Sequence, residues 1–265
     1  VIEPQDRNIY QIGETYGNAE LISSYVSSGQ LDAQFDFNVY DAAIAVFATP
    51  EIPATRLADK LKESLKYYGN HNLMGYITGN QDRARFISYA DGSVKFSEDA
   101  KLAGWTRKIE LKNPEAYKNL AMLHTFNLTI PGIPVIYYGD EIGMVGGNDP
   151  DNRRMMVFEN LSENQIQLKN YVSNLCKLRT NNLALIYGDL QFLYESENIL
   201  VFSRKFFEEE VIVVFNKSSE SQTINLSKPS FLNGGIYVNA FSNEQFQFDT
   251  SLELEPLSTY VFTKN

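Results

Sequence analysis

The sequence predicts an α/β domain followed by an all-β domain. In the first part of the chain, short apolar strand candidates alternate four times with helix candidates, which is the pattern of βα units around a parallel sheet. After Asn182 the pattern changes to short apolar runs at turn-like spacing, which is typical of an antiparallel β-sandwich. We therefore expect one domain of residues 1–182 and a second of residues 183–265.

Each of the four expected strands in the first domain is a short apolar run that ends in turn residues. The fourth is bounded by Pro131, Gly132 and Gly139, and its apolar middle is expected to be buried on both faces. The strands are expected near 9–13, 33–37, 74–79 and 133–138. Helices are expected at 19–26, at 41–47, around the leucine stripe of Leu57, Leu61 and Leu65, at 116–128, and after the capping box Ser162–Gln165.

Two further segments complete the expected organisation. The polar stretch 87–113 is predicted to be a long loop with a turn at Asp91-Gly92, and loops of that length are often functional. In the second domain the period-two alternation of Leu252-Glu253-Leu254 is typical of a strand with one buried face. The expected strands there are 199–202, 211–215, 224–226, 237–241, 246–248, 252–254 and 260–262.

Composition excludes several classes of function. The 265 residues carry a formal charge of −10, which would repel a phosphate backbone, so we expect no nucleic-acid partner. The single cysteine, Cys176, excludes an internal disulfide and a cysteine-based metal cluster, and its helical context indicates a core residue. No apolar run approaches the roughly 20 residues of a membrane helix. No signal peptide is visible, but the chain begins with Val1, so we expect it to be part of a longer protein, extracytoplasmic if that protein has a signal peptide.

Carboxylates follow three of the four strand candidates, at the end where parallel α/β folds build their sites. They are Glu14, Asp82 and Asp140. Other interpretations of the same residues are a surface position for Glu14 and a helix N-cap for Asp82, with Arg85 as its solvated neighbour.

Two adjoining segments carry a resemblance to a known family. Pro131–Met144 (Pro-Gly-Ile-Pro-Val-Ile-Tyr-Tyr-Gly-Asp-Glu-Ile-Gly-Met) and Gly146–Arg154 (Gly-Gly-Asn-Asp-Pro-Asp-Asn-Arg-Arg) resemble the last barrel strand and following loop of the α-amylase family of glycoside hydrolases (family 13). The resemblance is to its neopullulanase and oligosaccharide α-glucosidase branches and covers essentially the whole chain. It implies the second half of a (β/α)8 barrel, with four βα units, followed by the family's C-terminal β-sandwich.

The resemblance also implies roles for individual residues. Asp149 and Arg153 fall on the Asp-Pro-x-x-Arg that holds a sugar beyond the cleavage point in those branches. Glu14, in Ile12-Gly13-Glu14-Thr15-Tyr16-Gly17, is similar to the segment that carries the general acid/base. Asp82 resembles the Asp of the family's Asn-His-Asp segment, which stabilises the transition state. From the same motif, Asn80, Gln81 and Arg85 are expected to bind substrate, although Gln81 replaces the usual His and cannot carry its positive charge.

The nucleophile of the family lies on the strand before the acid/base. Only Val1–Arg7 precede the Glu14 strand here, so the Arg-x-Asp motif is missing, and Glu3 and Asp6 lack a strand context. We therefore expect part of a retaining glycoside hydrolase that acts on α-linked glucans and that is inactive on its own. Alternatives are a non-catalytic amylase-like interaction scaffold, a glycosyltransferring relative, and a carbohydrate-binding module built on residues 183–265 alone.

No cofactor or metal is expected. His71 lies in a turn-like stretch and His124 in a helix, where a lone His is rarely a ligand. Calcium, which amylase relatives often bind, is held largely by parts absent from this sequence, so none is claimed. Trp105 is expected either to stack on a sugar or to cover the barrel edge. The expected partners are an α-glucan or maltooligosaccharide and a second copy of the chain, because half a barrel leaves open strand edges and an apolar face.

Overall fold

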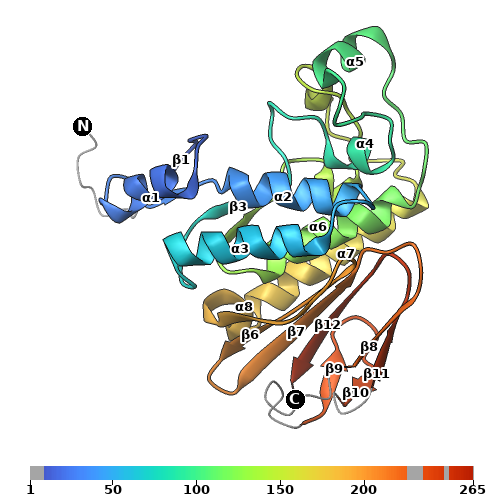
Figure 1. Cartoon of the computed structure of the whole chain (residues 1–265). Helices are drawn as coiled ribbons and strands as arrows, with labels where there is room; N and C mark the ends of the chain where they lie inside the picture. Colours follow the sequence, from blue (N-terminus) through green and yellow to red (C-terminus); the bar gives the residue numbers. More distant parts are fainter. Residues whose placement is uncertain (1–8, 226–234, 248–250, 265) are drawn as a thin grey trace.

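The structure, a computed structural model, describes residues 9–225, 235–247 and 251–264 (Figure 1). The ends of two predicted strands, Leu226 and Phe248, lie outside these ranges, as do Glu3 and Asp6.

Four short parallel strands form the first part of the fold. They are β1 (Ile12–Gly13), β2 (Ala33–Gln34), β3 (Gly75–Ile77) and β4 (Ile133–Val135). β1 pairs with β2 and β3 with β4, and a parallel bridge between Phe35 and Gly75 joins the two pairs, so the strands lie side by side in chain order. The predicted parallel pairing is confirmed, but every strand is shorter than predicted: β1 begins later than expected, and β2, β3 and β4 end earlier. Asp36, for example, accepts a hydrogen bond from the Val39 amide and starts a helix at Phe37, where a strand was expected to continue.

Helices follow each strand, as predicted. The first three are α1 (Ala19–Ser27), α2 (Phe37–Ala48) and α3 (Ala54–Tyr68), and the leucine stripe of α3 is turned inward, with Leu57 and Leu61 fully buried. After β4 come two short 3-10 helices, η1 (Asp140–Ile142) and η2 (Asp151–Arg153), then α7 (Glu163–Thr180), which begins at the predicted Ser162–Gln165 capping box, and α8 (Leu183–Tyr187).

The segment between β3 and β4 departs from the prediction. The stretch 87–113 was expected to be one loop, but it contains most of α4 (Phe86–Ala90) and all of α5 (Ala100–Thr106) before the expected α6 (Ala116–Thr129). Asp99 starts α5 by accepting hydrogen bonds from the amides of Lys101 and Leu102. Figure 1 shows α4 and α5 at the end of the molecule away from the C-terminal strands.

The C-terminal part is antiparallel, as predicted. A six-stranded sheet has the order β10-β9-β12-β7-β6-β5, and a two-stranded sheet pairs β11 with β8. The prediction missed the strand Asp189–Glu195, because its alternation of polar and apolar residues is broken at Phe192-Leu193-Tyr194, where its pairing with the next strand shifts register. The strands are β5 (Asp189–Glu195), β6 (Ile199–Phe206), β7 (Glu209–Asn216), β8 (Gln222–Asn225), β9 (Tyr237–Asn239), β10 (Gln245–Phe246), β11 (Ser251–Leu254) and β12 (Ser258–Lys264).

The larger sheet is buried on both faces. Ile199 and Val201 of β6 point into the core shared with the two-stranded sheet, whereas Leu200 and Phe202 point into the core shared with the helices. On the helix side, Phe215 of β7 packs on aromatic rings from α2 and α6 at centroid distances of 5.5 and 6.4 Å. One continuous apolar core therefore joins the βα units to the C-terminal sheet.

Two buried arginines reinforce this junction. Arg179 of α7 donates to the carbonyl oxygens of Leu128 and Ile130 at 2.9 and 3.1 Å, at the end of α6. Arg204 of β6 donates to the carbonyl oxygens of Thr129 and Gly188. The last carbonyls of a helix have no partner inside the helix, so these guanidinium groups supply the missing donors. Burial lowers the pKa of Arg179 to about 10 and that of Arg204 to about 9, and both remain charged at neutral pH.

Candidate active site

The side chain of Asn80 links the loops that follow β1 and β3. Its Nδ2 donates to Glu14 Oε1 at 3.4 Å, and its Oδ1 accepts a hydrogen bond from the Asp82 amide at 3.0 Å. Glu14 and Asp82 therefore lie at the same end of the strands, as predicted. Both side chains are exposed, Asp82 at 61%, so a ligand can reach them.

Arg153 extends this group to the loop after β4. Its Nη2 lies 3.1 Å from Asp82 Oδ1, and its Nε lies 2.9 Å from Asp149 Oδ1. Lys101 of α5 approaches the other oxygen of Asp149, with 3.7 Å between Nζ and Oδ2. Exposed ion pairs of this kind contribute little to folding stability, so their charged groups can turn to a ligand at small cost. We call Glu14, Asn80, Asp82, Asp149 and Arg153 the carboxylate cluster.

Gln81 stands beside this cluster. Its Nε2 donates to Asp82 Oδ2 at 3.0 Å, and its carbonyl oxygen accepts a hydrogen bond from Arg153 Nε at 3.2 Å. The amide that replaces the expected His thus supports the orientation of Asp82 by a neutral hydrogen bond.

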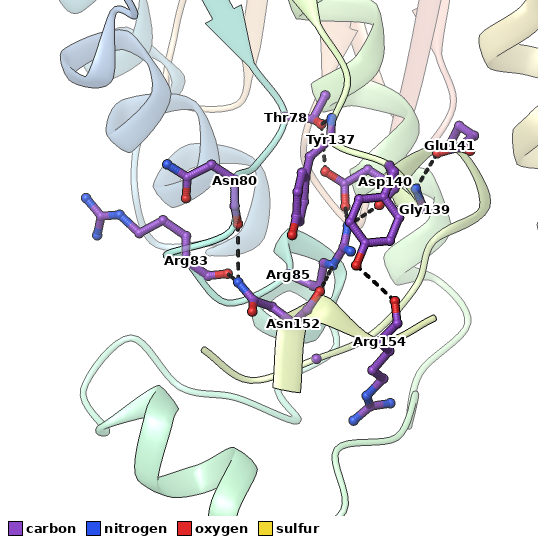
Figure 2. A network of polar contacts seen from close by, with 12 residues as sticks. Thr78, Asn80, Arg83, Arg85, Tyr137, Gly139, Asp140, Glu141, Asn152 and Arg154 are labelled. Carbon is purple, nitrogen blue, oxygen red and sulfur yellow. Dashed lines mark hydrogen bonds and ion pairs between the residues drawn. The ribbon is translucent and has the colours of Figure 1, made fainter. Parts of the chain in front are cut away.

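Sequence analysis missed Asn152, which holds the two loops together. This residue is fully buried, and its Nδ2 donates toward the carbonyl oxygens of Asn80, Gln81 and Arg83 at 3.2, 2.8 and 2.6 Å (Figure 2). Its position between Asp149 and Arg153 was a signal that it belongs to the site. Its role depends on backbone carbonyls from a distant segment, which no sequence pattern reveals.

The structure places Arg85 beneath the site rather than on its surface. It is 2% exposed, and its Nη1 lies 2.8 Å from Asp140 Oδ1. Nη1 also donates to the Tyr138 carbonyl oxygen at 2.6 Å, and Nε donates to the Asn152 carbonyl oxygen at 3.0 Å. Figure 2 shows this guanidinium group among the rings and backbone of the loop after β4. The prediction that Arg85 binds substrate conflicts with this burial, because Nε and Nη1 already serve the protein and Nη2, which has no hydrogen-bond partner among the described residues, is buried as well.

The Arg85–Asp140 pair is enclosed by aromatic and polar groups. The guanidinium carbon lies 4.1 Å from the Tyr137 ring centroid and 4.9 Å from that of Tyr138. Thr78, directly after β3, donates to Asp140 Oδ2 at 2.6 Å and accepts from the Tyr137 amide at 3.1 Å. Burial raises the pKa of Tyr137, with Arg85 acting in the opposite direction. This layer ties β3 to the loop after β4 and supports the exposed cluster above it.

The remaining candidates have structural surroundings. His124 is fully buried in α6, where its Nε2 lies 3.0 Å from the Asp140 carbonyl oxygen, and burial lowers its pKa. His71 is exposed and lies 3.4 Å from Asp189. Cys176 is half-buried against the core, and burial raises its pKa. Within the described ranges, no group of three His, Cys, Asp or Glu side chains could hold a metal ion, and no helix is long and apolar enough to cross a membrane.

Carboxylates at the C-terminal ends of parallel strands are typical of α/β enzymes, (β/α) barrels among them. Comparison with known proteins shows the family. The model of the α-amylase catalytic domain matches residues 1–181, and the model of the maltogenic amylase C-terminal domain matches residues 190–261. The chain therefore belongs to the α-amylase family, which confirms the resemblance found in the sequence.

Several relatives are similar over most of the chain. Cyclomaltodextrinase from Geobacillus thermopakistaniensis (strain MAS1) is 30% identical over 259 residues, which are 96% of this chain and 39% of the relative. Neopullulanase 2 from Thermoactinomyces vulgaris is 29% identical over 88% of this chain and 36% of its own length. Cyclomaltodextrin glucanotransferase from Geobacillus stearothermophilus is 32% identical over 69% of this chain and 25% of its own length.

Solved structures show the same fold. The α-amylase from Geobacillus thermoleovorans, solved in complex with acarbose, superposes with a TM-score of 0.81 at 26% identity, over 97% of this chain and 53% of that one. The Anoxybacillus α-amylase gives a TM-score of 0.80 at 25% identity, over 96% of this chain and 52% of that one. The chain thus spans about half of these solved amylases and less than half of the relatives compared above.

Proposed function

We propose that this chain is the C-terminal half of the catalytic unit of a retaining glycoside hydrolase that acts on α-linked glucans. Glu14 is the general acid/base, and Asp82 stabilises the positive charge that develops on the sugar in the transition state. Asp149 and Arg153 bind a sugar next to the scissile bond, and Asn80 and Gln81 orient the two carboxylates. The boundary at 182/183, which falls between α7 and α8, remains part of the proposal.

One observation carries this proposal: a single side chain, that of Asn80, bonds Glu14 and the Asp82 backbone across two different βα loops. Two carboxylates that flank one bond must be held at a fixed separation, and a shared amide does this without neutralising either charge. A scaffold protein would not need this arrangement. The relatives in the comparison supply the substrate class, since their names refer to maltodextrins and pullulan.

Arg85 takes a different role from the one predicted. We assign it as a positioning residue, which acts through the Asn152 carbonyl and the backbone of Tyr138 rather than through substrate. The missing member of the site is the nucleophile. The relatives are more than twice as long as this chain, and we propose that a first half of the barrel, outside these 265 residues, supplies it.

The face that such a first half would cover offers a route to self-association of the isolated chain. Among the described strands, β1 and β4 each pair with one neighbour, and Ile133, Val135 and Ile136 are only partly buried. Open strand edges beside apolar side chains favour pairing with another chain. We propose that two copies of the chain associate through this face when the first half is absent.

Glucan binding tests the proposal directly. Titration calorimetry of the 265-residue chain with maltoheptaose should show binding that Arg153→Ala weakens about tenfold, which is roughly 1.4 kcal/mol. Arg56→Ala, an exposed arginine on α3, is the matched control and should leave binding unchanged. A chain that does not bind maltoheptaose, or that binds it equally well without Arg153, would support the interaction-scaffold alternative instead.

Glycosyl transfer is the second candidate activity, because a glucanotransferase is among the similar proteins. The two reactions share the glycosyl-enzyme intermediate and differ in the acceptor, water or a sugar hydroxyl. Product analysis of the complete enzyme with maltoheptaose separates them, because only transfer yields chains longer than the substrate.

A further inference from the structure

The α5 helix carries an exposed tryptophan that the carboxylate cluster does not use. Trp105 is the only tryptophan of the chain, and 69% of its surface is exposed. Indole rings bury a large apolar area in most folds, so an exposed one forgoes substantial stabilisation. Covering the edge of the βα layer was one predicted role of Trp105, but a ring this exposed covers little of it.

Trp105 borders a shallow, open hollow of about 650 Å³ between α5 and the loop after β4. The other walls are mainly polar, with side chains of Arg107, Lys108, Asp151 and Arg154. An aromatic face beside several hydrogen-bonding groups suits a pyranose ring, whose C–H face is apolar and whose rim carries hydroxyls. Arg107 and Lys108 are in surface ion pairs with Glu98 and Glu110, and such pairs exchange for a ligand at small cost. Their N–H groups can then donate to hydroxyl oxygens, and a carboxylate accepts from hydroxyl hydrogens.

The walls of this hollow are held in place before any ligand arrives. Arg154 donates two hydrogen bonds to Asp151, from Nε to Oδ1 at 2.9 Å and from Nη2 to Oδ2 at 3.0 Å. The same Asp151 Oδ2 accepts a hydrogen bond from the Gly147 amide at 2.7 Å, and Arg154 Nη2 also donates to the Ile109 carbonyl oxygen at 3.0 Å. The α5 helix lies so close to the loop 149–154 that a Cβ on Gly104 would come within 2.8 Å of Asp151 Cβ. Little ordering is therefore needed on binding.

The hollow and the carboxylate cluster are built on the same loop and the same helix. The loop 149–154 serves both, because Asp149 and Arg153 contact the cluster while Asp151 and Arg154 line the hollow. The α5 helix also contributes residues to both the hollow and the surroundings of the carboxylate cluster. Lys101, which approaches Asp149, and Trp105 are four residues apart, so they share one face of α5 with a rise of about 6 Å between them.

We propose that this hollow is an outer glucan subsite, in which Trp105 stacks on a glucosyl unit of a chain whose inner units occupy the carboxylate cluster. The inference rests on the proposed function and extends it to substrate length. A short saccharide fills the cluster alone, whereas a long one also reaches the indole. Trp105 thus favours long maltooligosaccharides over maltose.

Because the chain has one tryptophan, its fluorescence reports this subsite directly. Titration with maltoheptaose should shift or quench the emission to a plateau, and the β-linked cellohexaose should not. In calorimetry, Trp105→Ala should weaken maltoheptaose binding about fivefold to tenfold and maltose binding less than about twofold. Trp105→Phe, which keeps an aromatic face, should restore most of the loss. Phe207→Ala, at an 81% exposed aromatic residue after β6, is the control and should change neither affinity.

The possible failures are distinguishable. If Arg153→Ala weakens maltoheptaose binding but the emission does not change and Trp105→Ala binds normally, the outer subsite is refuted and the proposed function stands. If Trp105→Ala weakens the binding of maltose and of maltoheptaose equally, Trp105 acts by supporting the carboxylate cluster, and the proposed preference for long saccharides is refuted. If no saccharide binds the wild-type chain, both proposals fall. The fluorescence titration uses the wild-type chain, so the test does not depend on a variant that folds.

Discussion

Replacing Arg85 by methionine should mainly destabilise the fold. The substitution keeps an unbranched side chain but removes the 2.8 Å ion pair with Asp140 and the hydrogen bonds to the carbonyls of Tyr138 and Asn152. The Asp140 side chain is 3% exposed and would stay buried with only Thr78 to donate to its carboxylate. Removing one partner of a buried ion pair typically costs about 3–5 kcal/mol.

The effect is large enough to measure and small enough for the chain to remain folded. Domains are typically stable by about 5–15 kcal/mol, and with a urea dependence of about 3 kcal/mol per molar the midpoint should fall by about 1–1.7 M. Circular dichroism at 222 nm follows the helices that surround the pair. Arg107→Met is the matched control, because Arg107 forms a 2.6 Å ion pair with Glu98 on the surface, and its midpoint should fall far less.

The same experiment decides between the two roles of Arg85. If Arg85 bound substrate directly, Arg85→Met would bind maltoheptaose more weakly but keep its stability. If Arg85 is a positioning residue, the variant loses both affinity and stability, because the loop that carries Asn152 is released. Equal midpoints for Arg85→Met and Arg107→Met would refute the buried-pair argument.

Three further predictions follow from the site and the fold. Burial lowers the pKa of His124, so the unfolded chain takes up a proton at a higher pH than the folded chain does. The free energy of unfolding should therefore be retained above about pH 6.5 and fall below it, by at most about 1.4 kcal/mol per pH unit. The drop in urea midpoint from pH 7 to 5.5 should therefore be smaller in His124→Gln than in wild type or in the exposed His71→Gln, and an unchanged drop would contradict this. The 265-residue chain should release no reducing sugar from maltoheptaose, because we propose that the nucleophile lies in the first half of the barrel, outside these residues; turnover that Glu14→Gln abolishes would show the opposite. Light scattering should find an associated chain, whereas a monodisperse monomer would exclude association through β1 and β4.

The sequence predicted the order of the elements well, because that order depends on local patterns. The leucine stripe of α3, the Ser162 capping box and the apolar runs of β6 and β7 all act within a few residues of themselves, and all are present. The β5 strand was missed because its alternation of exposed Asp189 and Gln191 with buried Leu190 is short and stops at a register shift after Phe192. Leu190 is buried in the core shared with the helices, and no local pattern contains that information.

Prediction of the site residues likewise succeeded where the signal was local in sequence and failed where it was not. The motifs placed Glu14 and Asp82 at strand ends, and the structure brings their loops together through Asn80. Their catalytic roles remain a proposal. Arg85 lies three residues after Asp82, and proximity in sequence suggested a shared role, yet the turn between them points one side chain outward and the other into the core. The sequence also gave no signal for Asn152 as a buried link, because its three carbonyl partners lie about 70 residues away.

The arginine on β6 has a consequence for recombination between relatives. A chimera that joins the βα units of this chain to a C-terminal sheet from another protein must bring an arginine to the place of Arg204. Without it, the carbonyl oxygen of the fully buried Thr129 loses its guanidinium donor, and an unsatisfied buried acceptor costs about 1–3 kcal/mol. Arg179, which is on α7, would travel with the βα units and keep its own carbonyls, but it would not replace the lost donor. Relatives that can supply a compatible C-terminal sheet can therefore be chosen by inspecting the position of Arg204 before any chimeric gene is built.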